Sequence, residues 1–316
     1  MTARIFIDGA AGTTGLEIRE RLAGREDVAV FELPDAERKS VTARAEALND
    51  ADLAILCLPD AAAKESVSLI KNNKVRVIDA STAHRVAPGW AYGFAEMAPG
   101  QREAIAGSTR VSNPGCYPTG FLALVRPLVS AGMVPADFPL TTNAVSGYSG
   151  GGKSMIEEFE KADSPAYVET VFRTYALTLA HKHVPEMQVH AGLKHAPVFA
   201  PSVGRFYRGM IVEVPLQLWA LPRQPTVAAV HDILASAYEH EKLIEVAGLE
   251  EAASLKTLDA EMVKNTNGMK LFVFGNDKMQ QARLVAVLDN LGKGAGGAAI
   301  QNMNIMLGLP ETTGLV

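Results

Sequence analysis

The sequence predicts an α/β protein in which a Rossmann-like, parallel-sheet dinucleotide-binding domain contains an inserted α+β catalytic domain. A chain of 316 residues is too long for one small core, so two domains are expected. Over the first 80 or so residues, β-prone runs alternate with helix-compatible segments, which is typical of a parallel sheet with right-handed crossovers. The alternation stops near residue 115. Strand-like segments then lie closer together, which favours a mixed or antiparallel second sheet.

The N-terminal elements follow a strand, turn, helix order. Residues 4–8 form a β-prone run, the glycine-rich segment GAAGTTG occupies residues 9–15, and residues 16–22 have helical spacing. Three further apolar runs predict the next strands, at 28–32, 53–58 and 75–79. We therefore expect a βαβ dinucleotide-binding arrangement to open the chain.

The remaining elements predict the second domain. Residues 121–131 read as a helix, and a strand, a glycine-rich loop and a helix follow at 140–145, 147–152 and 154–162. Later segments predict strands at 209–215, 271–275 and 284–289, and helices at 227–241 and 298–307. We expect residues 1–115 plus 285–316 to form the NADP-binding domain and residues 116–284 the catalytic domain.

Composition excludes several classes of protein. Apolar residues make up 48% and charged residues 21%, as in ordinary globular proteins, and the net charge of −5 disfavours a nucleic-acid partner. No stretch reaches the roughly 18 apolar residues that predict a membrane span. The N-terminus runs straight into a strand without a basic and then apolar leader, so we expect a cytoplasmic protein.

The glycine-rich turn at residues 9–15 predicts the nucleotide site. Gly9, Gly12 and Gly15, with Thr13 and Thr14, lie where the first βα turn of such a domain holds a pyrophosphate at a helix N-terminus. The G-x-x-G-x-x-G spacing departs from the common G-x-G-x-x-G, and its position between strand and helix is what carries the prediction.

The end of the second strand bears on the choice of cofactor. Glu32 suits the ribose diol of NAD, whereas Arg38, Lys39 and Ser40 suit a 2′-phosphate. A plain surface charge run is the alternative for these three residues. The basic cluster favours NADP(H) as the cofactor.

A competing motif lies in mid-chain. Residues 147–154, GYSGGGKS, match the P-loop pattern G-x-x-x-x-G-K-S/T, with a strand before and a helix after. A nucleoside triphosphatase is therefore a second hypothesis. It leaves the turn at residues 9–15 and Cys116 without a role, and a P-loop usually opens its domain.

Of the two cysteines, Cys116 is the expected nucleophile. Cys57 lies inside the apolar run 53–58, as a buried structural thiol would. Cys116 ends the segment SNPGC shortly before a predicted helix, whose positive end favours the thiolate. Asn113, three residues earlier, is placed to orient a substrate or donate a hydrogen bond.

The segment HKHVPE at residues 181–186 supplies the groups that a nucleophilic thiol needs. His181 or His183 can accept and return a proton, and Glu186 can orient a ring or bind substrate. If the segment is extended, both imidazoles lie on one side. A metal site is the alternative, but no Cys/His set with zinc-site spacing completes it, so no metal is expected.

Taken together, these motifs resemble a known family. The chain is similar over its whole length to N-acetyl-γ-glutamyl-phosphate reductases of the shorter form, and more distantly to aspartate-semialdehyde dehydrogenases. The matching segments begin at Gly9, Asp79, Tyr92, Ser112, Ser146, His181 and Leu288. The first glycine loop and residues 79–85 depart from the longer form of the family. The glycine-rich loop at 146–153 resembles the family's active-site loop, which removes the need for a P-loop.

The resemblance implies a two-stage reaction and its participants. Cys116 would attack the acyl phosphate of N-acetylglutamyl 5-phosphate and release phosphate, and NADPH would reduce the thioester to the semialdehyde, a step of arginine biosynthesis. It also implies a homodimer or homotetramer. An aspartate-semialdehyde dehydrogenase-like reductase is the alternative within the class.

Further site residues are predicted from the same resemblance and from the anionic substrate. The cofactor contacts are expected to include Ser81, Gly147, Gly150 and Asn290, and the run Gly292–Gly294 is expected to return to the cofactor. Guanidinium groups suit a substrate that is anionic at both ends. The expected substrate contacts are Ser146 and candidates among Arg85, Arg110, Arg205 and Arg208.

Overall fold

The computed structural model describes residues 2–315, which form two compact units. Unit 1 comprises residues up to Ala95, Pro99–Gly115 and Ala295 onward; unit 2 comprises Glu96–Ala98 and Cys116–Gly294. The second unit is thus inserted into the first. Unit 2 ends at Gly294 rather than at the predicted residue 284, because the strand Gln281–Leu288 pairs within the sheet of unit 2.

Unit 1 is built on a six-stranded sheet in the order β2-β1-β3-β4-β6-β5, with every pairing parallel. The strands are β1 (Ala3–Asp8), β2 (Val28–Phe31), β3 (Leu53–Leu56), β4 (Arg76–Asp79), β5 (Ala91–Tyr92) and β6 (Arg110–Ser112). The chain moves from β1 to β2 on one side and then to β3 on the other. This reversal creates the switch point at which such sheets bind nucleotides.

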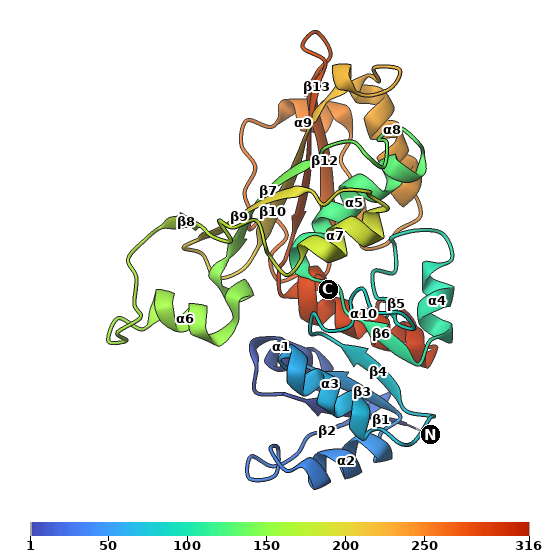
Figure 1. The fold of residues 1–316 in the computed structure, drawn as a ribbon, viewed down its shortest axis with the longest axis vertical. Helices are drawn as coiled ribbons and strands as arrows, with labels where there is room; N and C mark the ends of the chain where they lie inside the picture. Colours follow the sequence, from blue (N-terminus) through green and yellow to red (C-terminus); the bar gives the residue numbers. More distant parts are fainter. Residues whose placement is uncertain (1, 316) are drawn as a thin grey trace. The chain divides into compact units, whose positions relative to one another are not determined.

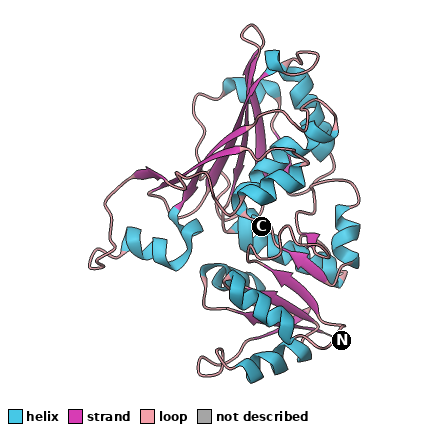
Figure 2. Ribbon diagram, in the orientation of Figure 1, coloured by secondary structure: helices cyan, strands magenta, loops and turns pink. Residues whose placement is uncertain are grey.

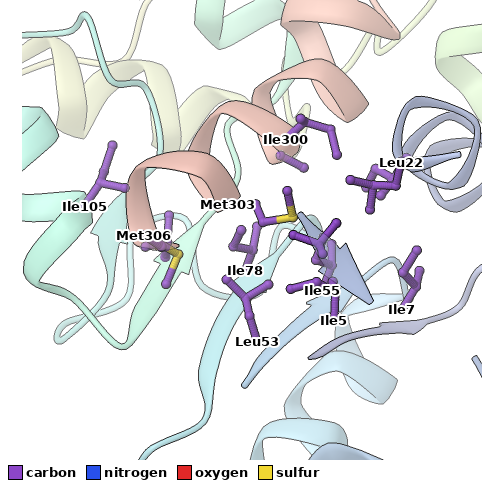
Figure 3. Packing of buried hydrophobic residues seen from close by; sticks show 14 of the residues in the cluster. Ile5, Ile7, Leu22, Leu53, Ile55, Ile78, Ile105, Ile300, Met303 and Met306 are labelled. Carbon is purple, nitrogen blue, oxygen red and sulfur yellow. The ribbon is translucent and has the colours of Figure 1, made fainter. Parts of the chain in front are cut away.

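Helices cover both faces of this sheet (Figures 1 and 2). On one face, α1 (Thr13–Leu22) and α4 (Gln101–Gly107) pack with α10 (Gly297–Leu307), the last helix of the chain. Figure 3 shows Ile300, Met303 and Met306 of α10 meeting residues of the sheet in one buried cluster. On the other face, α2 (Val41–Asp50) and α3 (Asp60–Leu69) cover a second cluster that includes Phe6 and Leu48.

Unit 2 contains a seven-stranded mixed sheet in the order β11-β12-β13-β10-β7-β9-β8. Its strands are β7 (Thr141–Gly147), β8 (Phe172–Thr174), β9 (Val198–Gly204), β10 (Met210–Gln217), β11 (Ile244–Val246), β12 (Met269–Asn276) and β13 (Gln281–Leu288). The pairs β7–β9 and β11–β12 are parallel and the other pairs are antiparallel. The predicted fold class, a parallel dinucleotide-binding sheet with an inserted α+β unit, is confirmed.

The helices of unit 2 lie mainly along one side of its sheet. Helices α5 (Cys116–Ser130) and α8 (Val227–Tyr238) pack on the strands, and α7 (Val184–Ala191) packs on α5. Helix α9 (Leu249–Ser254) packs on β12, and α6 (Gly152–Glu160) follows a short 3-10 turn after β7. Within residues 2–315, no helix is both long and apolar enough to cross a membrane.

Candidate active site

Cys116 is the first residue of helix α5, five residues before the start that the sequence predicts. The extended β6 ends at Ser112, and three residues of turn lead into the helix. The backbone N–H groups of a first helical turn have no partner within the helix, and the helix dipole is positive there. The thiol therefore sits at an end of α5 that stabilises negative charge, both on the sulfur and on an oxyanion bound beside it.

A cluster of aromatic and imidazole rings surrounds this end of α5. Tyr117 lies with its ring centroid 5.9 Å from that of His183 and 6.1 Å from that of His181. The two imidazole rings meet edge to face, with their centroids 4.7 Å apart. Phe199 and Tyr175 contact His181 from other sides. The structure thus brings both predicted histidines into one cluster of unit 2 with the residue that follows Cys116.

The segment 181–186 is not extended, so the condition under which strand alternation would place both imidazoles on one side is not met. His183 has helical dihedral angles and precedes α7, which has a proline within its first two positions and Glu186 in its first turn. The ring of His181 folds back so that its Nδ1 accepts a hydrogen bond, 3.1 Å long, from the backbone N–H of His183. A helix start, rather than strand alternation, is therefore what gathers the two rings.

Two tyrosines belong to the cluster and were not predicted from the sequence. The Tyr175 hydroxyl donates to that of Tyr117, which donates to the carbonyl of Ser202. Burial raises the pKa of Tyr117 well above its usual value, with further contributions from Tyr175 and Cys116. Burial also raises the pKa of Tyr175 to about 12; its bond to Tyr117 opposes the shift and Cys116 adds to it. Both phenols therefore stay neutral near pH 7.

The glycine-rich loop after β7 does not have the form of a P-loop. The consecutive backbone N–H groups of residues 147–149 donate to carbonyls of Gly209, Phe206 and Tyr207. These three amides are therefore engaged in loop packing, which disfavours the nucleoside-triphosphatase hypothesis for this loop. A side chain at Gly147 would meet the Tyr207 carbonyl oxygen at 2.5 Å, so this glycine allows the two loops to pack.

Two of the predicted cofactor contacts and one substrate contact lie around this loop. The amide of Asn290 is buried between loops, accepting from the Gly209 N–H and donating to the Ser149 hydroxyl. Its polar atoms thus hold the two loops together, and a cofactor contact by Asn290 stays a prediction. Gly150 lies next to the Ser146 hydroxyl and the Asn290 amide. Ser146 is buried and also hydrogen-bonds to Tyr117, which places it in the cluster at Cys116.

The four arginine candidates have different surroundings. Arg208 of unit 2 is mostly buried and pairs through Nε with the carboxylate of Asp289, at 2.8 Å. Arg205 donates from all its nitrogens to carbonyls of Phe159, Val168 and Thr170, so it fixes that segment and does not serve as a substrate contact. Of these two, only Arg208 suits an anionic ligand.

The other two arginine predictions lie in unit 1 and are corrected by their partners. Arg85 is buried and donates to the carbonyls of Asn113 and Ala80. Arg110 stands at the amino end of β6, away from the turn at its carboxyl end, and donates to the carbonyls of Val75 and Thr109. Both guanidinium groups donate hydrogen bonds to backbone carbonyl oxygens. The presence of an arginine in the sequence does not show whether its partner is a carbonyl group or a substrate.

Asn113 forms hydrogen bonds within unit 1. It is buried, its amide nitrogen donates to the carbonyl of Ala295, and its oxygen accepts from Asn302. Asn302 also donates to the Gly93 carbonyl. The Asn113 side chain is therefore used within unit 1 to fix the turn that leads to Cys116, and a contact with substrate stays a prediction.

The glycine turn of unit 1 has the geometry of a phosphate cradle. Gly9 has φ +91°, and a side chain there would meet the Cys57 carbonyl oxygen at 2.4 Å. A side chain at Gly15 would meet the Gly9 carbonyl oxygen at 2.6 Å, whereas one at Gly12 would have no contact shorter than 3.6 Å. The fold thus requires glycine at the first and third positions. No protein atom lies close enough to require glycine at position 12. The space beside Gly12 can therefore hold a ligand at the start of α1.

The start of α1 also contains an orphaned polar atom. The Thr13 hydroxyl oxygen is buried and has no hydrogen-bond partner within residues 2–315. Thr13 and Thr14 are the first two residues of the helix, whose N-cap is Gly12. Free N–H groups, an orphaned hydroxyl and space above a glycine fit a pyrophosphate.

A pocket of about 440 Å³ extends from this turn to the end of β2. Its lining includes Gly9, Glu32 and the predicted Arg38, with Arg19 and Lys39. Arg38 pairs with the exposed Asp35 at 3.2 Å. Ser40 does not line the pocket; it caps α2 by accepting from the Ala43 N–H, which corrects its prediction as a cofactor contact.

Ser81 follows β4 and is buried in a tight turn. Its N–H and hydroxyl donate to the two carboxylate oxygens of Asp79, and its oxygen accepts from the Ala83 N–H. His84 completes the arrangement, with Nδ1 2.6 Å from Asp79 and its ring stacked on Trp90. These hydrogen bonds shape the end of β4. They do not test the cofactor contact expected of Ser81, which stays a prediction.

Lys293 was expected to reach the cofactor and instead forms a buried ion pair. Its Nζ lies 2.7 Å and 2.8 Å from the two carboxylate oxygens of Glu96. Only 1% of the Lys293 side chain and none of the Glu96 side chain are exposed, so the ammonium group is not available to a phosphate. No local sequence pattern points to this ion pair, because 197 residues separate the two side chains.

Comparison with known proteins gives consistent matches. Residues 4–107 match the family model described as semialdehyde dehydrogenase, NAD binding domain, and residues 116–290 match semialdehyde dehydrogenase, dimerisation domain. N-acetyl-gamma-glutamyl-phosphate reductases of Brucella ovis and Brucella canis are 57% identical over 309 residues, covering 98% of this chain and 100% of theirs.

Solved structures share the fold at low identity. Aspartate semialdehyde dehydrogenase II of Vibrio cholerae superimposes with a TM-score of 0.72 at 15% identity, covering 97% of this chain and 98% of that chain. Aspartate semialdehyde dehydrogenase of Candida albicans, solved with NADP, gives a TM-score of 0.66 at 13% identity, covering 96% and 98%. These likenesses support the two-unit architecture.

Proposed function

Because the chain belongs to the N-acetyl-gamma-glutamyl-phosphate reductase family, we propose that it reduces N-acetyl-L-glutamyl 5-phosphate to the 5-semialdehyde and phosphate. The reaction is a step of arginine biosynthesis. The observation that supports the mechanism is the position of Cys116 as the first residue of α5, directly before Tyr117, whose ring contacts both histidines. Aspartate-semialdehyde dehydrogenase activity is the weaker alternative, since the likenesses to those enzymes are at 13–16% identity.

The residues of unit 2 account for the acyl-transfer steps. The Cys116 thiolate attacks the acyl carbon, the C–O bond to phosphate breaks, and a thioester forms on Sγ. The positive end of the α5 dipole stabilises the oxyanion of each tetrahedral species. After reduction, the thiohemiacetal oxyanion collapses, the C–S bond breaks, and the aldehyde leaves with the thiolate restored.

We assign proton transfer to His183 rather than His181. The Nδ1 of His181 accepts the N–H of His183, so the neutral His181 ring has its proton on Nε2. His181 therefore acts as a hydrogen-bond donor, and it gains a proton only by losing that bond. Glu186, buried in the first turn of α7, is suited to orienting this cluster, and Arg208 to binding an anionic group of the substrate.

The cofactor that fits unit 1 is NADP(H). When bound, it supplies the hydride that reduces the thioester carbon. The N–H groups at the start of α1, the Thr13 hydroxyl and the space above Gly12 would hold the pyrophosphate. Arg19, Arg38 and Lys39, which line the pocket at the end of β2, would hold the 2′-phosphate.

Replacement of the nucleophile tests the proposal. Wild-type protein should reduce NADP in the presence of phosphate and N-acetylglutamate 5-semialdehyde, and Cys116→Ser should abolish this activity because a hydroxyl is not ionised near neutral pH. Cys57→Ser is the matched control and should retain it. Equal or faster turnover of aspartate semialdehyde by the wild type would favour the alternative.

The quaternary structure and compartment follow from the same assignment. Residues 116–290 match a dimerisation domain, and we propose a homodimer or homotetramer in the cytoplasm. Light scattering coupled to size-exclusion chromatography distinguishes these two assemblies from each other and from a monomer of 33.7 kDa.

A further inference from the structure

The buried Glu96–Lys293 ion pair has no place in the reaction as described so far. Both charges are removed from water, with the Nζ held equally by both carboxylate oxygens. A pair buried in this way often adds little net stability, because desolvation offsets the attraction. We therefore explain the buried ion pair by a role in fixing the local backbone conformation. The residues around Lys293 show which segment of backbone is fixed.

Lys293 lies within a single turn of π-helix, Gly292–Gly296, which follows β13. The turn is anchored at its start by Asp289, whose Oδ1 accepts the N–H groups of Leu291 and Gly292 and whose carbonyl accepts that of Gly294. A π-turn is rare and tends to occur at functional sites. Asp289 and the Glu96–Lys293 pair thus hold the first half of the turn.

The middle of the turn packs against Cys116. A side chain at Gly294 would lie 2.7 Å from the Cβ of Cys116 and 3.2 Å from its Cα, so the Gly294 backbone itself packs on the cysteine. Glu96 also lies near α5: it contributes to the raised pKa of Tyr238, after burial, and the Tyr238 hydroxyl donates to the Ala123 carbonyl of α5. All of these residues belong to unit 2.

We propose that the Glu96–Lys293 pair positions Cys116, by locking the turn 292–296 so that Gly294 fixes the side-chain direction of the thiol at the start of α5. Glu96 and Lys293 are positioning residues and do not touch the reactants. The inference rests on the proposed role of Cys116 as nucleophile. It adds two residues, far apart in the sequence, on which the reactivity of that thiol depends.

The test replaces both charges and measures the thiol directly. The double variant Glu96→Gln/Lys293→Met leaves no lone buried charge, and it should fold. Its rate of Cys116 alkylation by iodoacetamide, followed from pH 6 to 10, should fall about threefold or more, and kcat should fall about tenfold or more, as expected for a misplaced reactive group. KM for NADPH should stay within about twofold, since unit 1 is unchanged.

Two further variants complete the test. The variant Glu96→Asp keeps the negative charge on a shorter side chain. Its rate of Cys116 alkylation should lie between the rates of the wild type and the double variant. Arg283→Gln breaks an exposed ion pair with Glu213 in the same unit and should match the wild type throughout. Wild-type alkylation profiles in both pair variants, whatever their thermal stability, would overturn the proposal. An inactive wild type would instead reject the reductase function, while the alkylation profiles would still decide the positioning role.

Discussion

The two cysteines of this protein differ at the level of single residues. Cys116 begins a helix, whereas Cys57 follows β3 near two buried carboxylates. Burial raises the pKa of the Cys57 thiol to about 12, and the charges of Asp79 and Asp8 add to the shift. The neutral thiol is therefore the stable form of Cys57 over the whole working range of pH.

Alkylation should separate the two thiols. Iodoacetamide reacts with the thiolate, so at pH 7.5 it should label Cys116 and leave Cys57 unmodified in the folded protein. Labelling of Cys57 should appear only as the pH approaches 12 or when the protein unfolds. Peptide mass spectrometry of labelled wild type and Cys116→Ser checks this; substantial label on Cys57 at pH 7.5 would contradict it.

The two histidines should also differ. We expect His183→Ala to lower kcat by about 100-fold or more and to remove one limb of the pH–rate profile, as loss of a general acid or base does. His181→Ala should lower kcat less and keep both limbs, because in our assignment His181 helps to hold the cluster, accepting the His183 N–H at its Nδ1, and does not transfer the proton. Profiles measured with both variants decide the assignment, and the reverse pattern would transfer the role to His181.

At the level of elements, two glycines of the turn before α1 have different roles: Gly15 is required for folding, and Gly12 leaves space for the cofactor. Gly15→Ala places a methyl group 2.6 Å from a backbone oxygen and should destabilise the protein by roughly 1–3 kcal/mol. Gly12→Ala meets no such obstacle, so its stability should stay within about 1 kcal/mol of wild type, while its affinity for NADPH falls roughly tenfold. Urea unfolding and fluorescence titration measure the two quantities; unchanged binding by Gly12→Ala would argue against the pyrophosphate site.

Local sequence signals predicted most elements and fewer of the site contacts. Apolar alternation and glycine spacing predicted β1, α1 and the second sheet, because both signals arise within a few residues. The start of α5 was predicted too late, since the sequence CYPTG has little intrinsic helix preference and burial of Tyr117 and Phe121 decides its conformation. The ion pairs and carbonyl contacts of arginines and Lys293 depend on residues distant in the chain, which no local pattern encodes.

At the level of the whole molecule, the core of unit 1 depends on the last helix of the chain. Met303 of α10 is fully buried among residues of the sheet. Met303→Ala should lower the free energy of unfolding by about 2–5 kcal/mol, as deletion of a buried side chain does. Met279→Ala, at a position that is 60% exposed, should change it by less than about 0.5 kcal/mol. Equal urea midpoints for the two variants would show that α10 does not support this core.

That dependence has a consequence for synthesis on the ribosome. The first 95 residues emerge early, yet the part of their sheet that α10 covers stays exposed until residues 297–307 leave the exit tunnel. Unit 2, whose sheet lies almost wholly within one continuous stretch, is complete before then. The N-terminal half of the nascent chain therefore waits, partly uncovered, while the inserted unit is made, and a chain that ends before α10 is expected to be a substrate for chaperones and proteases.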